Sequence, residues 1–317
     1  MTLLRLDPSD NVGIAQSTLS AGTKIDGITV KSTVSVGHKV ALTSIARGAP
    51  VIKYAQKIGL AYADIATGDH VHTHNLAFAA VDGDYTFGNN LRSLKSTKEV
   101  DTFLGFDRGN GRVGTRNYIG IVTSVNCSAT AARMIADHFT ADRLAAYPNV
   151  DGVAAFVHGT GCGMAGDGDG FEALQRVMWG YARHPNFAGV LMVGLGCEMN
   201  QIDWLLEAYG LEHGPLFHTM NIQSVAGLRR TIEAGIAKIE AMLPEANKAS
   251  RTPCPVSALK VALQCGGSDA WSGVTANPAL GHACDILAAQ GGTGVLAETP
   301  EIYGAEHLLT ARATTRE

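Results

Sequence analysis

YIGIVTSVNC, residues 118–127, is an apolar, β-rich run that ends at a cysteine, and it is one of four such runs. The other three are VAAFVHGTGC (153–162), VLMVGLGC (190–197) and LKVALQC (259–265). Glycine adjoins three of the four cysteines, and glycine lets a backbone turn sharply or approach a ligand closely. Open α/β proteins place their sites at the carboxyl ends of their strands, so we expect the four cysteines at one sheet edge. The alternative for any single cysteine is a small buried hydrophobe.

Helical periodicity between these runs, as in FEALQRVMWGYARH (171–184), predicts an α/β fold with a doubly wound parallel sheet. Before it, short β runs between turns predict a small all-β unit, in which TVKSTVSVG (29–37) alternates like a strand. Four segments are expected: an all-β domain (1–76), a polar linker (77–102), an α/β domain carrying cysteine loops (103–248), and the start of a further α/β domain (255–317). Because a new α/β unit has only just begun when the chain stops, we expect this last domain to be truncated.

Composition limits the partners. The net charge of −4 over 317 residues argues against nucleic acid, which basic surfaces bind. No apolar run approaches the roughly 20 residues that span a bilayer, and the N-terminus lacks the features of a signal peptide. We therefore expect a cytoplasmic protein with reduced thiols, no membrane partner and a small-molecule substrate. The sequence leaves open whether it forms a homo-oligomer.

Three histidines alternate in GDHVHTHN, residues 68–75. In a strand, residues i, i+2 and i+4 share a face, so His70, His72 and His74 are expected to project together. Three imidazoles on one face can bind a divalent metal or supply an acid–base pair. The alternative is a solvated polar face of a strand.

Two further segments suggest ligand contacts. GFDRGNGRVGTRN (105–117) places three arginines in a turn-forming loop, which suits a carboxylate or phosphate, although a surface hairpin with solvated arginines explains it equally. CGGSDAWSGVTANP (265–278) is dense in small polar groups that can hydrogen-bond a hydroxylated ligand.

Several motifs occur in an order that resembles one enzyme family. They are GHKVAL (37–42), HVHTHN (70–75), VGTRN (113–117), GLGCE (194–198), CGGSD (265–269) and SGVTANP (272–278). Together they resemble the altronate/galactarate dehydratase family from about residue 10 to the end. The resemblance implies an N-terminal SAF domain, which is a β-clip unit, and an iron-stimulated sugar-acid dehydratase.

The reaction that the resemblance implies is a β-elimination from an aldonate or aldarate such as altronate or galactarate. A base removes the proton beside the carboxylate, the 3-hydroxyl leaves as water, and a 2-keto-3-deoxy acid forms. The intermediate needs strong electrostatic stabilisation, which a metal can supply. Iron, as Fe²⁺ or an Fe–S cluster with Mn²⁺ as a substitute, is expected on the cysteines, and the histidines are the competing site.

The residue assignments that follow are hypotheses. The candidate metal ligands are Cys127, Cys162, Cys197 and Cys265. The catalytic candidates are His72, His74, Glu198 and Asp269. The candidates for substrate binding are Arg112, Arg116, Asn117, Ser268 and Asn277.

Two other functions stay open. One is a lyase like the sulfolactate sulfo-lyases, which share this core and carry its two parts on separate subunits. The other is an inactive sugar-acid-binding fragment that needs a C-terminal partner. A nicotinamide enzyme is disfavoured, because GLGCEMNQ (194–201) lacks the third glycine of a dinucleotide fingerprint.

Overall fold

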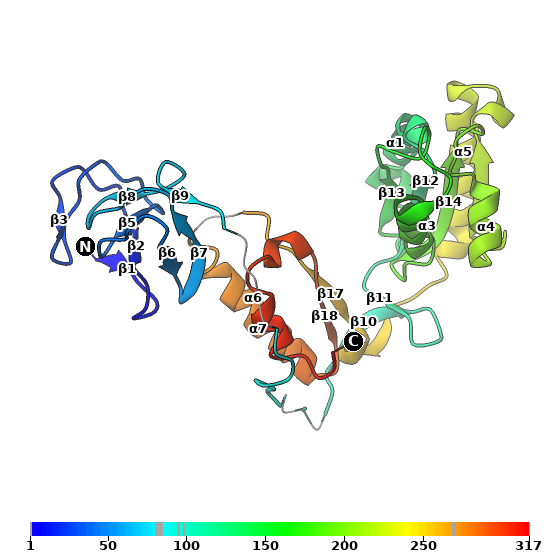
Figure 1. Ribbon diagram of the computed structural model, residues 1–317. Helices are drawn as coiled ribbons and strands as arrows, with labels where there is room; N and C mark the ends of the chain where they lie inside the picture. The colour runs from blue at the N-terminus through cyan, green and yellow to red at the C-terminus, as the bar shows by residue number, and fades with distance from the viewer. Residues whose placement is uncertain (1, 80–84, 94–95, 98, 268–269, 317) are drawn as a thin grey trace. The chain divides into compact units, whose positions relative to one another are not determined.

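The computed structural model describes residues 2–79, 85–93, 96–97, 99–267 and 270–316 (Figure 1). The chain forms two compact units. The first unit joins Met1–Lys98 to Lys260–Glu317, and the second is Glu99–Leu259. The C-terminal segment that we expected as a separate domain therefore belongs to the same unit as the N-terminal β segment.

The N-terminal segment of the first unit is built from short antiparallel strands, as the sequence predicts. One sheet has the order β1-β2-β5-β8, with β1 (Leu3–Leu4), β2 (Val12–Ala15), β5 (Lys39–Ala41) and β8 (His70–Val71). A second sheet has the order β6-β7-β9, with β6 (Pro50–Lys53), β7 (Gln56–Ala61) and β9 (Leu76–Ala77). A hairpin pairs β3 (Lys24–Ile25) with β4 (Ile28–Thr29) across Asp26-Gly27, both with positive φ, as a type I′ turn requires.

The long strand expected over 29–37 is wrong. Only Thr29 lies in a strand, and Val34 forms an isolated bridge with Leu19. The backbone of this segment hydrogen-bonds to several different segments and not to one neighbouring strand. Lys31 N–H donates to the Gly68 carbonyl and Gly37 N–H to that of Ala15. Small apolar side chains hold the β segment together in two buried clusters, one around Val30, Val34 and Val40 and one around Val51, Ile65 and Val71.

The C-terminal segment of the first unit is a βαβ element followed by helical turns. Strands β17 (Lys260–Leu263) and β18 (Thr293–Leu296) pair in parallel, with α6 (Ala276–Ala289) between them. The short elements η4 (Thr299–Ile302) and α7 (Glu306–Thr310) follow. The expected linker over 77–102 falls in part outside the described residues. Its described part is tied to this segment, because Asn90 N–H donates to the Ala311 carbonyl and Thr97 N–H to that of Ala289.

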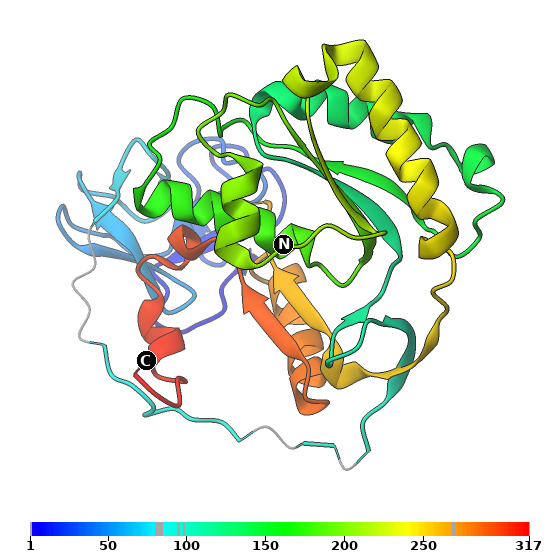
Figure 2. The ribbon, with the colours of Figure 1, turned by 90° about the vertical axis from the view of Figure 1, so that its right-hand side faces the viewer.

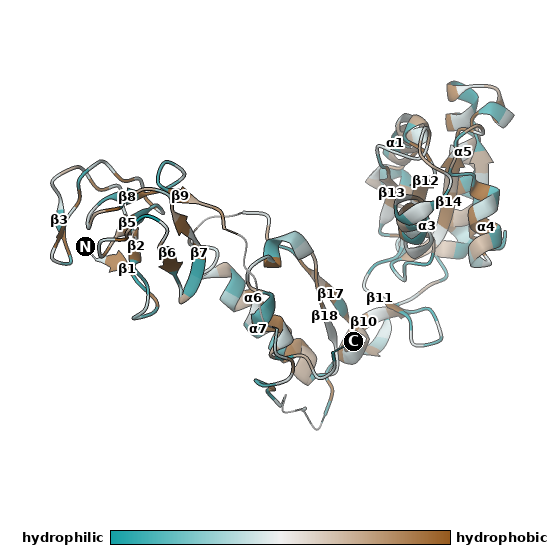
Figure 3. Cartoon of the chain, in the orientation of Figure 1, coloured by the Kyte–Doolittle hydropathy of each residue, from teal (hydrophilic) through white to brown (hydrophobic). Residues whose placement is uncertain are grey.

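The second unit is built on a parallel sheet with the order β13-β12-β14-β15. Its strands are β12 (Tyr118–Thr123), β13 (Gly152–Phe156), β14 (Phe187–Gly194) and β15 (Phe217–Asn221). In Figure 3 the middle strands are apolar along much of their length, as expected for strands buried on both faces. All carboxyl ends of these strands therefore meet at one edge of the sheet.

Helices cover both faces of this sheet (Figure 2). On one face, α1 (Ala129–His138) and α5 (Leu228–Ala246) pack on Ile119, Ile121 and Leu191. The helices cross closely, because an added Cβ at Gly235 would lie 2.4 Å from Ile135 Cδ1. On the other face, α3 (Gly168–Ala182) and α4 (Ile202–Tyr209) pack on Val190 and Met192.

A small antiparallel sheet completes the second unit at the amino-terminal edge of the parallel sheet. Strand β10 (Thr102–Asp107) pairs with β11 (Val113–Gly114) and β16 (Thr252–Pro255) in an antiparallel sheet. The remaining elements are α2 (Ala141–Leu144) and the 3₁₀ turns η1 (Asn126–Ser128), η2 (Gln223–Val225) and η3 (Val256–Ala258). Among the described helices of both units, none has the length and apolar character needed to cross a membrane.

Candidate functional site

Three of the four predicted cysteines follow neighbouring strands at the carboxyl edge of the second unit's sheet. Cys127 follows β12, Cys162 follows β13 and Cys197 follows β14, and all three are exposed. The pKa of the Cys162 thiol is raised, first by the negative charge of Cys127, then by burial, a hydrogen bond with Cys127, and the charges of Cys197 and Glu198. The thiols therefore lie close enough to influence one another's ionisation, as the sequence predicts for these three.

Backbone hydrogen bonds tie the three cysteine loops to one another. The N–H of Asn126 donates to the Thr160 carbonyl at 2.9 Å, and that of Asn200 to the Gly161 carbonyl at 3.2 Å. Met199 N–H donates to the carbonyl of Cys162 itself at 3.3 Å. Gly161 has φ +97°, and a Cβ there would lie 2.3 Å from the Ser124 carbonyl oxygen, so the loop requires glycine at this point.

The carboxylate of Glu198 is the anchor beneath these loops. It is 2% exposed, and it accepts hydrogen bonds from Ser124 Oγ at 2.6 Å, Leu195 N–H at 3.1 Å and Gly196 N–H at 2.5 Å. Burial raises the pKa of this carboxyl, but the hydrogen bonds from Ser124 and from the backbone outweigh burial, and the net pKa is lowered. Glu198 is thus held ionised by its loop, and its role in metal binding or proton transfer stays a prediction.

A glycine makes room for this carboxylate. A Cβ on Gly194 would lie 2.4 Å from Glu198 Oε1 and 2.4 Å from Asn221 Oδ1. Among the described residues, Asn221 Oδ1 is buried without a hydrogen-bond partner. The same is true of Asn200 Oδ1, two residues after Glu198 in the chain. The edge therefore holds buried polar oxygens close to an ionised carboxylate, an arrangement that a donor or a cation would stabilise.

Two neighbouring side chains complete the edge. Gln223 Nε2 donates to Cys197 Sγ at 3.2 Å, so an amide contacts one of the three thiols. The ring of His158 is used structurally: Nδ1 accepts from Thr160 N–H and Nε2 lies 2.9 Å from the Thr123 carbonyl. These two contacts require the tautomer with the proton on Nε2.

In the first unit, the histidines gather, but not by strand alternation. Strand β8 ends at Val71, and a turn follows in which Asn75 Oδ1 accepts from His72 N–H at 3.0 Å. The rings of His72 and His74 nonetheless come near His70 and His38, with centroids 4.9–5.5 Å apart in the contacting pairs. The sequence reasoning missed His38, whose Nδ1 lies 2.9 Å from His70 Nε2.

In this histidine cluster (His38, His70, His72 and His74), the pKa values of two rings are lowered. Burial first, and then the charges of His38, His74, His72 and Lys39, lower the pKa of His70 to about 4. Burial first, and then His38, Lys39 and His74, also lower the pKa of His72. Neutral imidazoles can accept protons or bind metal ions.

The fourth cysteine lies in the first unit. Cys265 follows β17, its N–H donates to Glu298 Oε2 at 3.1 Å, and Asn277 Nδ2 lies 3.7 Å from its Sγ. Cys265 and Asn277 are therefore together, as expected for a polar loop. Ser268 and Asp269 lie outside the described residues.

The predicted arginine site is at the opposite edge of the sheet from the three cysteines. Arg112 and Arg116 precede β12, and residues before a parallel strand lie at its amino end. Arg116 pairs with Asp151 at 3.6 Å. Asn117 is fully buried, and its side chain donates to the Asn149 and Ala246 carbonyls, so its role is structural, which corrects the prediction that it binds substrate.

The iron expected at the cysteine edge stays a prediction. In the described part of the chain, no set of three or more His, Cys, Asp or Glu is placed to hold a metal ion. The three exposed thiols nonetheless fit iron by their chemistry, because thiolates favour soft or borderline metals and Fe–S clusters. The mutual effect of the thiols on the pKa of Cys162 is the charge repulsion that a bound cation relieves.

Three family models match successive parts of the chain. The altronate/galactarate dehydratase SAF domain matches residues 1–79, the second domain of D-galactarate dehydratase/altronate hydrolase matches 105–247, and the C-terminal domain of D-galactarate/altronate dehydratase matches 256–317.

Individual relatives are similar over nearly the whole chain. Altronate dehydratase of Escherichia coli K12 is 39% identical over 98% of this chain, and altronate dehydratase of Bacillus subtilis 168 is 36% identical over 100%. Galactarate dehydratase (L-threo-forming) of Escherichia coli K12 is 35% identical over 99% of this chain. The chain spans 62%, 63% and 62% of the length of these three relatives, respectively.

Proposed function

Because the chain belongs to the D-galactarate dehydratase/altronate hydrolase family, we propose that it dehydrates a sugar acid such as altronate or galactarate. The product is the corresponding 2-keto-3-deoxy acid. The observation that most directly supports this proposal is the gathering of three exposed thiols over an ionised, buried Glu198 at one sheet edge. A polar, thiol-rich edge of this kind suits a small hydroxylated anion with a metal.

We further infer that the second unit is doubly wound. In the strand order β13-β12-β14-β15, the chain adds β13 on one side of β12 and then β14 and β15 on the other side. The order of addition therefore reverses between β12 and β14. In sheets of this kind ligands bind outside the carboxyl ends of the strands at the reversal point. Cys127 and Cys197 follow β12 and β14, the two strands that flank that point.

Cys127, Cys162 and Cys197 are the residues of this unit that would hold iron. When bound, iron would supply a Lewis acid that stabilises the charge developing on the substrate carboxylate. The chain's own contribution is to position the ligands. Glu198 fixes the loop of Cys197 through Leu195 N–H and Gly196 N–H, and it fixes the β12 loop through Ser124.

The histidine cluster of the first unit is the proposed source of the base. An imidazole can remove a proton only when it is neutral, and the lowered pKa of His72 keeps it neutral at pH 7. A hydrogen bond between His38 Nδ1 and His70 Nε2 orients those two rings. Removal of the proton beside the carboxylate then leads to loss of the 3-hydroxyl as water.

Turnover tests the proposal directly. The purified protein, loaded with ferrous iron in the absence of oxygen, is incubated with D-altronate or galactarate, and the keto acid product is measured. We expect turnover of one of these sugar acids, and a loss of about tenfold or more in Cys162→Ser, since changing even a residue that only supports a metal ligand commonly costs about 10- to 100-fold. Cys284→Ser, on α6 of the first unit, changes a cysteine that is part of neither the cysteine edge nor the histidine cluster; it is the matched control and is expected to retain activity.

A folded, iron-loaded protein that forms no keto acid from either substrate would contradict the proposed reaction. Equal turnover in Cys162→Ser and Cys284→Ser would instead remove the cysteine edge from the reaction.

A further inference from the structure

A second candidate site lies at the amino-terminal edge of the second unit's sheet. A cavity of about 370 Å³ opens between the β10–β11 hairpin, the end of α3 and the starts of β14 and β15. Its volume falls in the range of about 300–1,000 Å³ that small-molecule sites occupy. The cavity is lined by β14 from Phe187 to Val190, which lies about 13–23 Å along the strand from its carboxyl end at Gly194.

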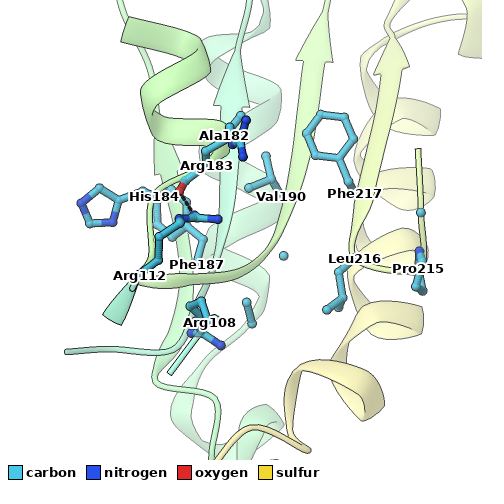
Figure 4. A pocket seen from close by; sticks show the side chains of 13 residues that line it. Arg108, Arg112, Ala182, Arg183, His184, Phe187, Val190, Pro215, Leu216 and Phe217 are labelled. Atoms are coloured by element: carbon cyan, nitrogen blue, oxygen red, sulfur yellow. Dashed lines mark hydrogen bonds between the residues drawn. The ribbon is translucent and has the colours of Figure 1, made fainter. Parts of the chain in front are cut away.

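One side of the cavity is basic. Figure 4 shows Arg108, Arg112 and Arg183 together on that side. The ion pairs of the described residues include four other arginines of this unit but none of these three. The positive charge of Arg112 also affects His184, which lines the same cavity. The pKa of His184 is lowered by burial first and then by the charge of Arg112.

Two of these arginines keep donors free for a ligand. Arg112 uses one nitrogen to donate to the Arg183 carbonyl, and no other hydrogen bond of its side chain occurs among the described contacts. Within the described part of the chain, the Arg183 guanidinium makes only a cation–π contact, 5.8 Å from the Trp179 ring centroid. Arg108 has a structural task, because it donates to the Pro185 carbonyl and to Asn117 Oδ1. Each guanidinium carries five N–H donors in a planar fork that matches an oxyanion.

The opposite side of the cavity is apolar. Pro215, Leu216 and Phe217 lie across from the arginines in Figure 4, with Val190 between the two sides. An inorganic anion would leave this wall without a contact. A ligand with an oxyanion at one end and a short apolar body fits both walls.

We propose that this cavity binds a small organic carboxylate, with the carboxylate on Arg112 and Arg183 and its apolar body against Leu216 and Phe217. The site is separate from the cysteine edge, and it does not depend on the sugar-acid reaction. It also gives Arg112 a role in anion binding at a different edge from the one expected for the substrate.

Calorimetric titration of the whole protein with acetate, butanoate, inorganic phosphate and butylamine tests this proposal. Butanoate has two methylenes more than acetate and is expected to bind about 15-fold more tightly, because each buried methylene adds about fourfold in affinity. Phosphate is expected to bind more weakly than butanoate, and butylamine, which has the same apolar body with a positive charge, is expected not to bind.

Arg183→Gln is the critical variant, because the Arg183 side chain is exposed and has no hydrogen bond to the described residues whose loss would unfold the protein. We expect it to weaken butanoate binding roughly 10- to 100-fold, the effect of losing a hydrogen bond to a charged group. Arg229→Gln, an exposed arginine of α5 that pairs with Glu233, is the matched control and is expected to bind like the unaltered protein.

Three results would overturn the proposal: no binding of butanoate, equal binding of butanoate and butylamine, or equal affinity of Arg183→Gln and Arg229→Gln. Phosphate binding as tightly as butanoate would also overturn it, since the apolar wall would then have no part.

Discussion

Replacing Gly194 by alanine tests the packing beneath the cysteine loops. The new Cβ would lie 2.4 Å from Glu198 Oε1, 2.4 Å from Asn221 Oδ1 and 2.9 Å from Ser124 Oγ. Carbon cannot approach oxygen this closely, so the carboxylate or its partners must move. Protein interiors are close-packed, and Gly194, Glu198 and Ser124 are buried, so there is little space into which they can move.

The cost follows from two contributions. Overpacking a buried site costs about 1–3 kcal/mol. Loss of one hydrogen bond to the charged carboxylate of Glu198, such as the one from Ser124, costs about 1.5–3 kcal/mol. We therefore expect Gly194→Ala to lower the free energy of unfolding of the second unit by about 3–5 kcal/mol.

The assay is urea unfolding followed by tryptophan fluorescence. Trp179 and Trp204 lie in the second unit, so most of the signal reports on it. Gly180→Ala is the control, because a Cβ there meets no atom within 4 Å and alanine is the better helix former. It is expected to stabilise the unit by up to about 1 kcal/mol. A midpoint for Gly194→Ala equal to that of the unaltered protein would refute the close packing around Glu198.

Two further predictions concern the histidines and the arginine segment. In metal-free protein, His70 has a folded pKa of about 4, below its usual value of 6.5, so folding favours the neutral ring, and stability is expected to fall as the pH drops from about 6.5 towards 4. His70→Gln should reduce that fall in urea midpoints measured at pH 7 and pH 4.5, and an NMR titration midpoint of His70 near 6.5 would contradict the burial. Asn117→Ala should destabilise the second unit by about 2–4 kcal/mol in urea unfolding, because its side chain makes three hydrogen bonds. A raised KM for sugar acid without loss of stability would show instead that Asn117 contacts substrate.

The cysteine edge of the second unit could be predicted because its cause is local. A short apolar, β-rich run that gives way to small or polar residues is typical of a strand and its end, so Cys127, Cys162 and Cys197 could be expected to follow strands. Parallel strands then bring those ends to one edge. Which strands are neighbours is not local: β12 lies between β13 and β14 because of how the helices pack on the two faces.

The histidine cluster shows where a local pattern gives the right grouping for the wrong reason. Alternation would place His70, His72 and His74 on one face of a strand, but a turn held by Asn75 brings them together instead. His38 joins them because β5 pairs with β8, with Val40 opposite His70. Pairing between strands so far apart in sequence leaves no periodic signal, so His38 could not be recognised in this way.

The place of the arginine segment follows from the order of the residues in the chain. Arg112 and Arg116 come before β12, whereas Cys127 comes after it. Groups on either side of a strand lie at opposite edges of a parallel sheet. Because Arg112 precedes β12 and Cys127 follows it, the cavity that Arg112 lines is at the opposite edge of the sheet from the cysteines.

The ligands of bound iron provide the most direct test of the account. X-ray absorption at the iron edge is measured on protein loaded with ferrous iron without oxygen, and on a Cys162→Ser, Cys197→Ser double variant. We predict sulfur ligands on iron in the parent protein and their loss, with loss of bound iron, in the double variant. Iron that shows only nitrogen and oxygen ligands, and that the double variant retains, would contradict a metal site at the cysteine edge and shift it to the histidine cluster.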